Sequence, residues 1–486
     1  MDSKDFETAS GKLVQYIIEY RNGANKRKFS VLPDLEKIKP GYLQRLLPNR
    51  APENKEQFDE ILQDIRQKII PGLACPACTE LEVITLDWLV HALKLPEKFL
   101  SATGKRDPSH TGGGVIELSA SMACATLTMG LRDRMLRNYI KDPHSLSEDD
   151  HLKGNGPGSL VDRMVAYTSD QAHSSVSRAF RIAMVNSRII KSKRCGRRLV
   201  FDPVDLRRAI EKDLEKGFIP LMCVATMGTT STCEFEDLQG IGQVCNDYGI
   251  WFHVDAAYGG IALLCPELRH LSRGIELADS VNINAHKMMM VNVDSSPLWL
   301  SDHRVLTEAF EANPLYLHHA YGGMPDYRKW SLSLARGFRS LKLWFVLRTY
   351  GLSGLREMTR HHVELAKHFE RLLTEDGRFH ITNDVQFGLV CFQLKNDNSL
   401  TVALHDELMK KGDIFLVLGS TEISGEEGDE AVEAVSTEIV FLRFVCIHGT
   451  TMDDVEFAYE RISAAASYIL EGNDEGNGGV VTKGTR

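Results

Sequence analysis

The sequence predicts an α/β fold built on a mostly parallel sheet with helices on both faces. From about residue 75 to 345, short apolar runs alternate with helical patterns, and this alternation is typical of a parallel sheet whose two faces are covered. The 486 residues, 43% of them hydrophobic, are enough to bury a large core and to form two or three domains. In such folds, ligands bind at the carboxyl ends of the strands.

The N-terminal part, residues 1–74, is predicted to be a helical segment. The run FETASGKLVQYIIEY has apolar residues at helical spacing, and Pro33, Pro40 and Pro48 interrupt the pattern. Helices of this kind bury little apolar surface within one chain. We therefore expect them to pack on a second subunit.

Residues 75–345 then form the large domain, and residues 346–470 a smaller α/β domain. In the latter, the helical run HHVELAKHFERLLTE precedes FGLVCFQLK, DIFLVLGS and EIVFLRFVCI, whose alternation predicts a small antiparallel sheet. The acidic insert SGEEGDEAVEAVST is interpreted as a solvated loop. The glycine-rich residues 471–486 are predicted to be a disordered tail.

Charge and cysteine usage exclude several function classes. The chain has 57 basic and 66 acidic residues, a net charge of −9, which disfavours nucleic-acid and anionic-membrane partners. The basic run KSKRCGRR is interpreted as a solvated loop. No apolar run is long enough for a transmembrane helix and MDSKDFETAS does not resemble a signal peptide, so the expected compartment is the cytosol. Ten scattered cysteines predict no disulfide framework, and CPAC has no second half to complete a metal site.

Lys287 is a candidate carbonyl-capturing amine. It lies in NINAHKMMMVNVDSS, where three methionines, Met288 to Met290, provide an apolar flank. Burial or neighbouring charge makes a lysine nucleophilic by destabilising its ammonium form. The alternative is an ordinary solvated lysine.

Asp255 ends IWFHVDAAY, an apolar run that reads as a buried strand. A buried carboxylate needs a cationic or hydrogen-bonding partner, and a pyridinium nitrogen is one. The small residues that follow, Ala256 and Ala257, leave space for a flat ring. The alternative is a structural aspartate that caps a helix or forms an ion pair.

Three further motifs place polar groups after apolar runs. GGGVIELSASMACATL has Ser119 and Ser121 at the start of a helical pattern, where free N–H groups and hydroxyls can bind an anion or simply cap the helix. SDQAHSSV places His173 where its imidazole could stack on a planar ring or only start a helix. VATMGTT places Thr230 at a turn.

Together these motifs resemble the pyridoxal-phosphate-dependent aromatic L-amino-acid decarboxylases, the family of the dopa, tyrosine and histidine decarboxylases. The matching runs extend in order over nearly the whole chain: PGYLQRLLP, PACTELE, GGGVI with SAS, SDQAHSSV, VATMGTT, WFHVDAAYGG with CPELRHL, NAHK, NPLYLHH, DYRKW and FRSLKLWFVLR. The resemblance implies fold type I of the pyridoxal-phosphate enzymes, a homodimer, and decarboxylation of an aromatic amino acid to a biogenic amine such as a catecholamine.

The resemblance also assigns roles to residues. Lys287 would hold the cofactor as an imine, Asp255 would keep the pyridine nitrogen protonated, His173 would stack on the ring and Ala257 would pack on its other face. The remaining cofactor contacts would be made by Ser119, Ala120, Ser121, Asn284 and His286 around the phosphate, and by Thr230 near the ring.

Tyr316, in NPLYLHH, would be the proton donor on a mobile loop. Related aldehyde-forming enzymes alter the stacking histidine or the loop tyrosine. Because His173 and Tyr316 are both present, an amine product is expected, and an aromatic aldehyde synthase is the alternative.

The sequence departs from the family most strongly after Gly72. In the family, several tens of residues rich in His, Trp, Phe, Tyr and Pro stand there and contribute to the substrate pocket and the dimer. Here Leu73, Ala74, Cys75 and Pro76 lead directly into ACTELE. Smaller departures are Leu118, Ala285, Met288 and Gly337, while Ala335 matches a position that lines the substrate pocket. A cofactor-binding but catalytically impaired paralogue, or a shortened isoform, is therefore a second alternative.

Overall fold

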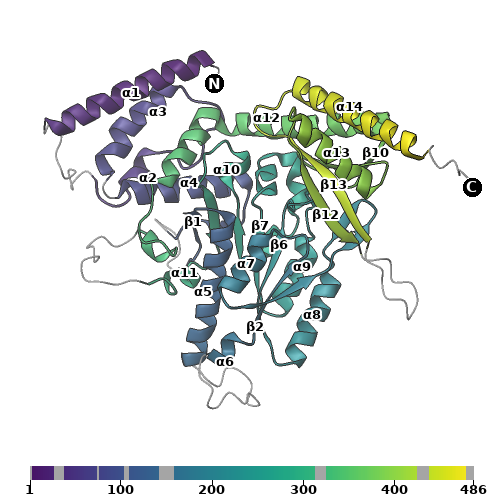
Figure 1. Cartoon of the computed structure of the whole chain (residues 1–486). Helices are drawn as coiled ribbons and strands as arrows, with labels where there is room; N and C mark the ends of the chain where they lie inside the picture. Colours follow the sequence, from purple (N-terminus) through teal and green to yellow (C-terminus); the bar gives the residue numbers. More distant parts are fainter. Residues whose placement is uncertain are drawn as a thin grey trace, which may run out of the picture.

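The chain folds around two sheets, each with its own helices (Figure 1). The computed structural model describes residues 3–26, 38–73, 76–102, 109–141, 158–311, 324–423 and 437–477. The larger sheet has seven strands in the order β1-β9-β8-β7-β6-β2-β3. Its strands are β1 (Gly113–Glu117), β2 (Met164–Ser169), β3 (Asn186–Ile190), β6 (Ile219–Thr226), β7 (Trp251–Asp255), β8 (Ser280–Asn282) and β9 (Ser296–Leu300).

Parallel pairing joins β3, β2, β6, β7 and β8, and β9 runs antiparallel between β8 and β1. The predicted mostly parallel sheet is confirmed. All residues of β2, β7 and β8 are buried, as expected for strands covered on both faces. The covering helices are α4 (Ala77–Leu93), α5 (Ala120–Lys141), α6 (Gly158–Val161), α7 (Ser174–Ile182), α8 (Pro203–Glu215), α9 (Leu238–Asp247), α10 (Ala285–Met288) and α11 (Arg304–Thr307).

The smaller sheet has the order β10-β11-β13-β12 and is antiparallel throughout, as the sequence predicts. It consists of β10 (Phe379–Ile381), β11 (Leu389–Leu394), β12 (Val417–Ile423) and β13 (Thr437–Val445), packed with α12 (Arg339–Asp376), α13 (Asn398–Lys411) and α14 (Met452–Asn477). Because α14 continues to Asn477, residues 471–477 of the expected disordered tail are helical instead. The acidic insert, residues 424–436, lies outside the described residues.

Short helical turns connect the elements of the N-terminal segment and the large domain. They are the π-helical turn η1 (Ile65–Ile69) and the 3-10 turns η2 (Ile70–Gly72), η3 (Glu97–Phe99), η4 (Gly259–Leu264), η5 (Pro266–Ser272), η6 (Ile275–Leu277) and η8 (Tyr327–Lys329). The turns η4 to η6 lead from the end of β7 to β8 and so link two strands that carry residues of the candidate site.

The N-terminal segment is helical, with α1 (Ser3–Asn25), α2 (Tyr42–Leu46) and α3 (Phe58–Asp64). It joins α4 through η1 and η2, without the longer segment of the family. This short connection is packed: a Cβ on Gly72 would lie 2.2 Å from the hydroxyl oxygen of Tyr42. The carboxylate of Glu80, on α4, accepts hydrogen bonds from the backbone N–H groups of Gly41 and Leu43 at 2.6 and 2.7 Å. The helices α2 and α4 are therefore in direct contact.

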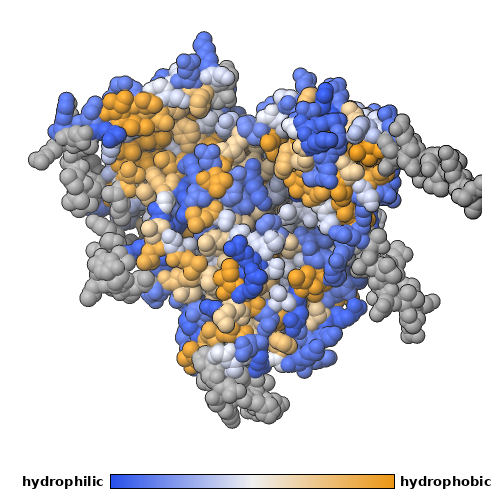
Figure 2. Space-filling view, viewed as in Figure 1, coloured by the Kyte–Doolittle hydropathy of each residue, from blue (hydrophilic) through white to orange (hydrophobic). Residues whose placement is uncertain are grey.

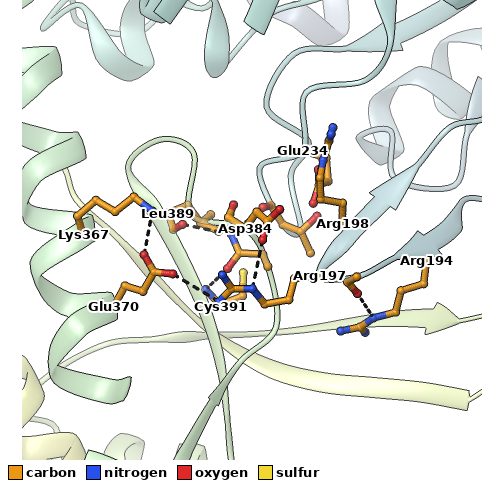
Figure 3. A network of polar contacts seen from close by, with 12 residues as sticks. Arg194, Arg197, Arg198, Glu234, Lys367, Glu370, Asp384, Leu389 and Cys391 are labelled. Atoms are coloured by element: carbon orange, nitrogen blue, oxygen red, sulfur yellow. Dashed lines mark hydrogen bonds and ion pairs between the residues drawn. The ribbon is translucent and has the colours of Figure 1, made fainter. Parts of the chain in front are cut away.

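The basic run KSKRCGRR is largely exposed, as its charge suggests, but it is a hairpin and not a loop. It forms a hairpin of β4 (Lys193–Cys195) and β5 (Arg198–Val200). Arg197 reaches across to the smaller domain, where it contacts Asp384 at 3.1 Å and Glu370 at 3.5 Å (Figure 3). Arg198 pairs with Glu234 at 3.2 Å. Because the carboxylates that pair with Arg197 belong to the smaller domain, the hairpin joins the two domains.

Candidate active site

The carboxyl ends of the parallel strands bring the predicted residues to one edge of the large sheet. Asp255 is the last residue of β7, and its register partners are Thr226 at the end of β6 and Asn282 at the end of β8. His173 follows β2 within four residues, and Lys287 follows β8 within five. A single edge therefore holds residues from four separate motifs.

Lys287 has a lowered pKa. Burial of its ammonium is the main cause; the negative charge of Asp255 opposes the shift, and the positive charge of Arg443 adds to it. The flank of Met288 and Met289 is buried, as the sequence predicts. By its accessible surface Lys287 is nevertheless an exposed residue, so it combines a destabilised ammonium with access for a carbonyl compound.

Asp255 is 5% exposed, and its position is fixed by two hydrogen bonds. The backbone N–H of Ala257 donates to Oδ1 at 3.0 Å, and the amide of Asn282 donates to the same oxygen at 3.2 Å. Oδ2 is therefore the oxygen left for an outside donor. Ala257 is buried and adds no side chain beyond its Cβ, so a flat ring could approach the backbone here.

The start of α5 lies against the lysine segment. Ser119 caps this helix, because its Oγ accepts from the N–H of Met122 at 3.2 Å; its hydroxyl hydrogen remains available to a ligand. The N–H of Ala120 donates to Asn284 Oδ1 at 3.1 Å. Ser121 is exposed at the first turn, where the N-terminus of a 22-residue helix favours an anion.

The two candidate histidines are held by backbone groups. His173 is the N-cap of α7, and its Nδ1 accepts from the N–H of Ser175 at 3.1 Å. Its ring is exposed, as a stacking role requires. Nδ1 of His286 lies 3.1 Å from the backbone nitrogen of Ser295, which anchors this ring beside the lysine. Thr230 is exposed in the loop after β6.

Arg443, which the sequence analysis missed, comes from β13 of the smaller domain. It donates to the backbone oxygen of Ser231 at 3.1 Å, and its charge lowers the pKa of Lys287. The smaller domain thus places a cation beside the loop that carries Thr230. The signal in the sequence is an arginine inside the apolar run EIVFLRFVCI, since a charge within a strand must find a partner.

Glu236, also missed, ties together two strand ends of the site. It is 6% exposed and lies next to Ser169 Oγ at the end of β2, while its other oxygen accepts from the N–H of Thr226 at 2.7 Å. Burial raises the pKa of this carboxyl from 4.5 to about 7, although both hydrogen bonds act in the opposite direction. Glu236 is therefore half protonated near neutral pH.

This raised pKa predicts a pH-dependent stability. The folded chain holds the proton of Glu236 more tightly than the unfolded chain, so its stabilising contribution is complete below about pH 4.5 and is lost as the pH rises through about 7. We expect Glu236→Gln to reduce the fall in Tm between about pH 5 and pH 8. The matched control is Glu267→Gln, because the ion pair with Arg360 lowers the pKa of Glu267 to about 2. Equal Tm profiles for wild type and Glu236→Gln would contradict this prediction.

Four apolar residues in segments near the site in the sequence are exposed. Leu118, Leu332, Leu334 and Val293 are 36%, 51%, 52% and 77% exposed. Of the smaller departures, Ala285 and Met288 are buried, and Gly337 has open space around its Cα. Tyr316 lies outside the described residues. Among the described residues, no group of His, Cys, Asp and Glu could hold a metal ion.

This donor set suits pyridoxal phosphate. A desolvated lysine can capture its aldehyde, a buried carboxylate can pair with its pyridine nitrogen, and the hydroxyls at the start of α5 can bind its phosphate. The fold and the site together define a pyridoxal-phosphate-dependent enzyme of fold type I.

Comparison with known proteins leads to the same class. The model of the pyridoxal-dependent decarboxylase conserved domain matches residues 73–395. The chain is 38% identical to the aromatic-L-amino-acid decarboxylase of Rattus norvegicus over 517 aligned positions, which cover 98% of this chain and 100% of the relative. It is 37% identical to that of Drosophila melanogaster, with 96% and 92% covered. The chain therefore belongs to the aromatic-L-amino-acid decarboxylase family of pyridoxal-dependent carboxy-lyases.

Solved structures agree with this assignment. Oryza sativa TDC with PLP and tryptamine is similar with a TM-score of 0.71 and 29% identity, over 96% of this chain and 99% of that one. Catharanthus roseus tryptophan decarboxylase in complex with L-tryptophan and Rhodiola rosea 4-hydroxyphenylacetaldehyde synthase each give a TM-score of 0.68, at 29% and 30% identity and with the same shares covered.

Proposed function

We propose that this protein removes the carboxylate of an aromatic L-amino acid as carbon dioxide and releases the amine. The observation that carries the proposal is the desolvated Lys287 beside the buried Asp255 at one strand edge. Relatives named for aromatic-L-amino-acid and tryptophan decarboxylation support the substrate class. When bound, pyridoxal phosphate supplies an electron sink for the breaking bond.

The residues of the chain would prepare the site for this reaction. Lys287 would hold the cofactor covalently through its amine, for which its lowered pKa is suited. Asp255, through Oδ2, would pair with the pyridine nitrogen and keep it protonated, so that the bound cofactor could act as an electron sink. His173 and Ala257 would contact the cofactor ring. Arg443 contributes positive potential that attracts an amino-acid carboxylate.

Tyr316 is our candidate for the group that returns a proton to the substrate carbon. An aromatic aldehyde synthase remains the second candidate, because the Rhodiola rosea structure is as similar as a decarboxylase is. Both reactions release carbon dioxide but they differ in the other products: the decarboxylase yields the amine, whereas the synthase consumes oxygen and water and yields aldehyde, ammonia and hydrogen peroxide.

The test is reconstitution of the purified full chain with pyridoxal phosphate. Borohydride reduction followed by mass spectrometry should place the cofactor on Lys287. Carbon dioxide, amine, aldehyde and peroxide are then measured with dopa, tyrosine, tryptophan and histidine. Amine with one equivalent of carbon dioxide supports the proposal, and aldehyde with peroxide selects the synthase. Trapped cofactor without turnover selects a catalytically impaired paralogue.

We further propose a homodimer whose contact includes the outer face of α1. Five apolar residues on this helix are 42% to 65% exposed: Phe6, Leu13, Val14, Ile17 and Ile18. Figure 2 shows apolar surface gathered over this part of the molecule. Within the chain, α1 is held largely by polar groups, such as Lys12 with Asp59 at 2.7 Å. A helix with such an apolar face is stabilised by burying it against a partner.

The dimer proposal predicts the effect of a charge on this face. Ile17→Glu should weaken self-association by about tenfold or more, since an unpaired carboxylate in an apolar contact is costly. The control is Glu7→Gln on the same helix, which removes a charge without adding one to the apolar face. Sedimentation at several concentrations gives the dissociation constant. A monomeric wild type, or an unchanged dimer in Ile17→Glu, would refute this contact.

We also propose a cytosolic location, because all nine cysteines among the described residues are free thiols. Separately, within the described part of the chain, no helix has the length and apolar character needed to cross a membrane.

A further inference from the structure

A series of hydrogen bonds runs through the large sheet and ends on Asp255. The indole Nε1 of Trp251 donates to Ser280 Oγ at 2.8 Å, and this oxygen lies 2.8 Å from His253 Nδ1. His253 Nε2 lies 2.9 Å from Asn282 Oδ1. The other end of the Asn282 amide donates to Asp255 Oδ1 at 3.2 Å.

This series is sealed from water. His253, Ser280 and Asn282 are each 0% exposed, and Trp251 is 7% exposed. They lie on the adjacent strands β7 and β8, where His253 is the register partner of Ser280 and Asp255 that of Asn282. The pairing of the two strands therefore sets the distances between these side chains. If one side chain rotated away, no water could take over its hydrogen bond.

The chemistry of the groups fixes the direction of three of the four hydrogen bonds. A carboxylate only accepts, so Asn282 must present its NH2 group to Asp255 and its oxygen to His253. That oxygen also only accepts, so Nε2 of His253 must carry a hydrogen. At the other end, the indole of Trp251 only donates, so Ser280 Oγ accepts from it and the hydroxyl hydrogen of Ser280 is free to point toward Nδ1.

The ring of His253 thus carries a hydrogen on Nε2, and its burial favours the neutral form. Burial lowers the pKa of His253, although the charge of Asp255 and the hydrogen bonds with Asn282 and Ser280 act in the opposite direction. With Nδ1 accepting from Ser280, the ring has one donor and one acceptor in use, and each matches its partner.

We propose that His253 is a positioning residue for Asp255: its Nε2–H holds the Asn282 amide so that nitrogen, and not oxygen, faces the carboxylate. Without this hydrogen bond the amide could rotate by half a turn and place its oxygen against Asp255, where it would repel the carboxylate. Oδ1 would then lose one of its two donors, and the oxygen that meets the cofactor ring would be less well fixed. The consequence for turnover rests on the proposed function; the protonation pattern does not.

The first test measures the tautomer in the protein without cofactor. The full chain, labelled with ¹⁵N in its 17 histidines, is examined by long-range ¹H–¹⁵N NMR, and the signals that vanish in His253→Phe identify this ring. We expect a neutral Nε2–H form that does not titrate between about pH 6 and pH 8. An Nδ1–H form or an imidazolium would overturn the proposal. Should His253→Phe fail to fold, His253→Gln provides the assignment.

The second test is a double-mutant cycle on the reconstituted enzyme. We expect His253→Phe and Asn282→Ala each to lower kcat by about tenfold and to change KM less. Since His253 acts through Asn282, the double variant should be no worse than the more severe single variant. If the fold reduction in kcat of the double variant equals the product of the two single reductions, the proposal is overturned. If wild type shows no turnover, the proposed function fails, and the same cycle is read from the dissociation constant of pyridoxal phosphate.

The matched control is His362→Phe, which replaces another buried imidazole, 2% exposed on α12. This variant should alter stability without changing kcat or the affinity for the cofactor. An equal fall in kcat for His362→Phe and His253→Phe would mean that loss of any buried histidine harms the enzyme, and the positioning role would be rejected.

Discussion

Replacement of Lys287 by alanine is expected to abolish turnover. This lysine is the desolvated amine of the site, and no other group would hold the cofactor covalently while substrate arrives. We expect kcat/KM to fall by at least ~10³-fold, because capture and orientation of the reactants are lost together. The reduced variant should carry no pyridoxyl group at position 287 in mass spectrometry.

Lys98→Ala is the matched control for this variant. Burial lowers the pKa of Lys98 too, but its ammonium contacts the backbone oxygen of Glu276 at 2.9 Å, far from Asp255. A lowered pKa alone does not create a cofactor site, so this variant should retain trapping and turnover. Retention of turnover in Lys287→Ala would disprove the assigned role.

Asp255→Asn is expected to separate cofactor capture from chemistry. The amide oxygen can still accept from Ala257 and Asn282, so the geometry at Oδ1 should persist. Only the charge opposite the pyridine nitrogen is lost. We expect kcat to fall by about 10²–10³-fold, which corresponds to about 3–4 kcal/mol of transition-state stabilisation. Borohydride should still trap the cofactor on Lys287.

A control for loss of a buried carboxylate is Asp213→Asn. Asp213 is 4% exposed and pairs with Arg188 at 2.9 Å, on the side of the sheet where α8 packs. Its replacement should lower Tm while kcat of the folded fraction stays near wild type. If Asp213→Asn lowers kcat as much as Asp255→Asn does, the effect at Asp255 reflects damage to the fold.

Much of the large domain could be predicted because burial on both faces of a parallel sheet leaves continuous apolar runs. The runs WFHVD and MVAYTS form β7 and β2. Asp255 at the end of the first run and His173 shortly after the second lie at the edge of the sheet that holds the site. The hairpin of β4 and β5 could not be predicted, since a run of basic residues looks solvated until its partners are known. Asp384 and Glu370, which neutralise Arg197, are more than 170 positions away.

The groups behind the site were missed for a related reason. His253 sits within an apolar run and was treated as part of a strand, because its partners Ser280 and Asn282 meet it only after β7 and β8 pair. The roles of Arg443 and Glu236 likewise depend on hydrogen bonds to other elements of the chain. Patterns along one strand reveal which residues are buried, whereas hydrogen-bond partners across strands depend on the completed sheet.

The contacts that join the two domains limit how the enzyme can open. Arg197 binds α12 and the segment after β10, and Arg443 binds the loop after β6. If one lobe rotated against the other, these contacts would either break or move the loop that carries Thr230 together with the smaller domain. These contacts between the domains therefore oppose a hinge motion of one lobe against the other.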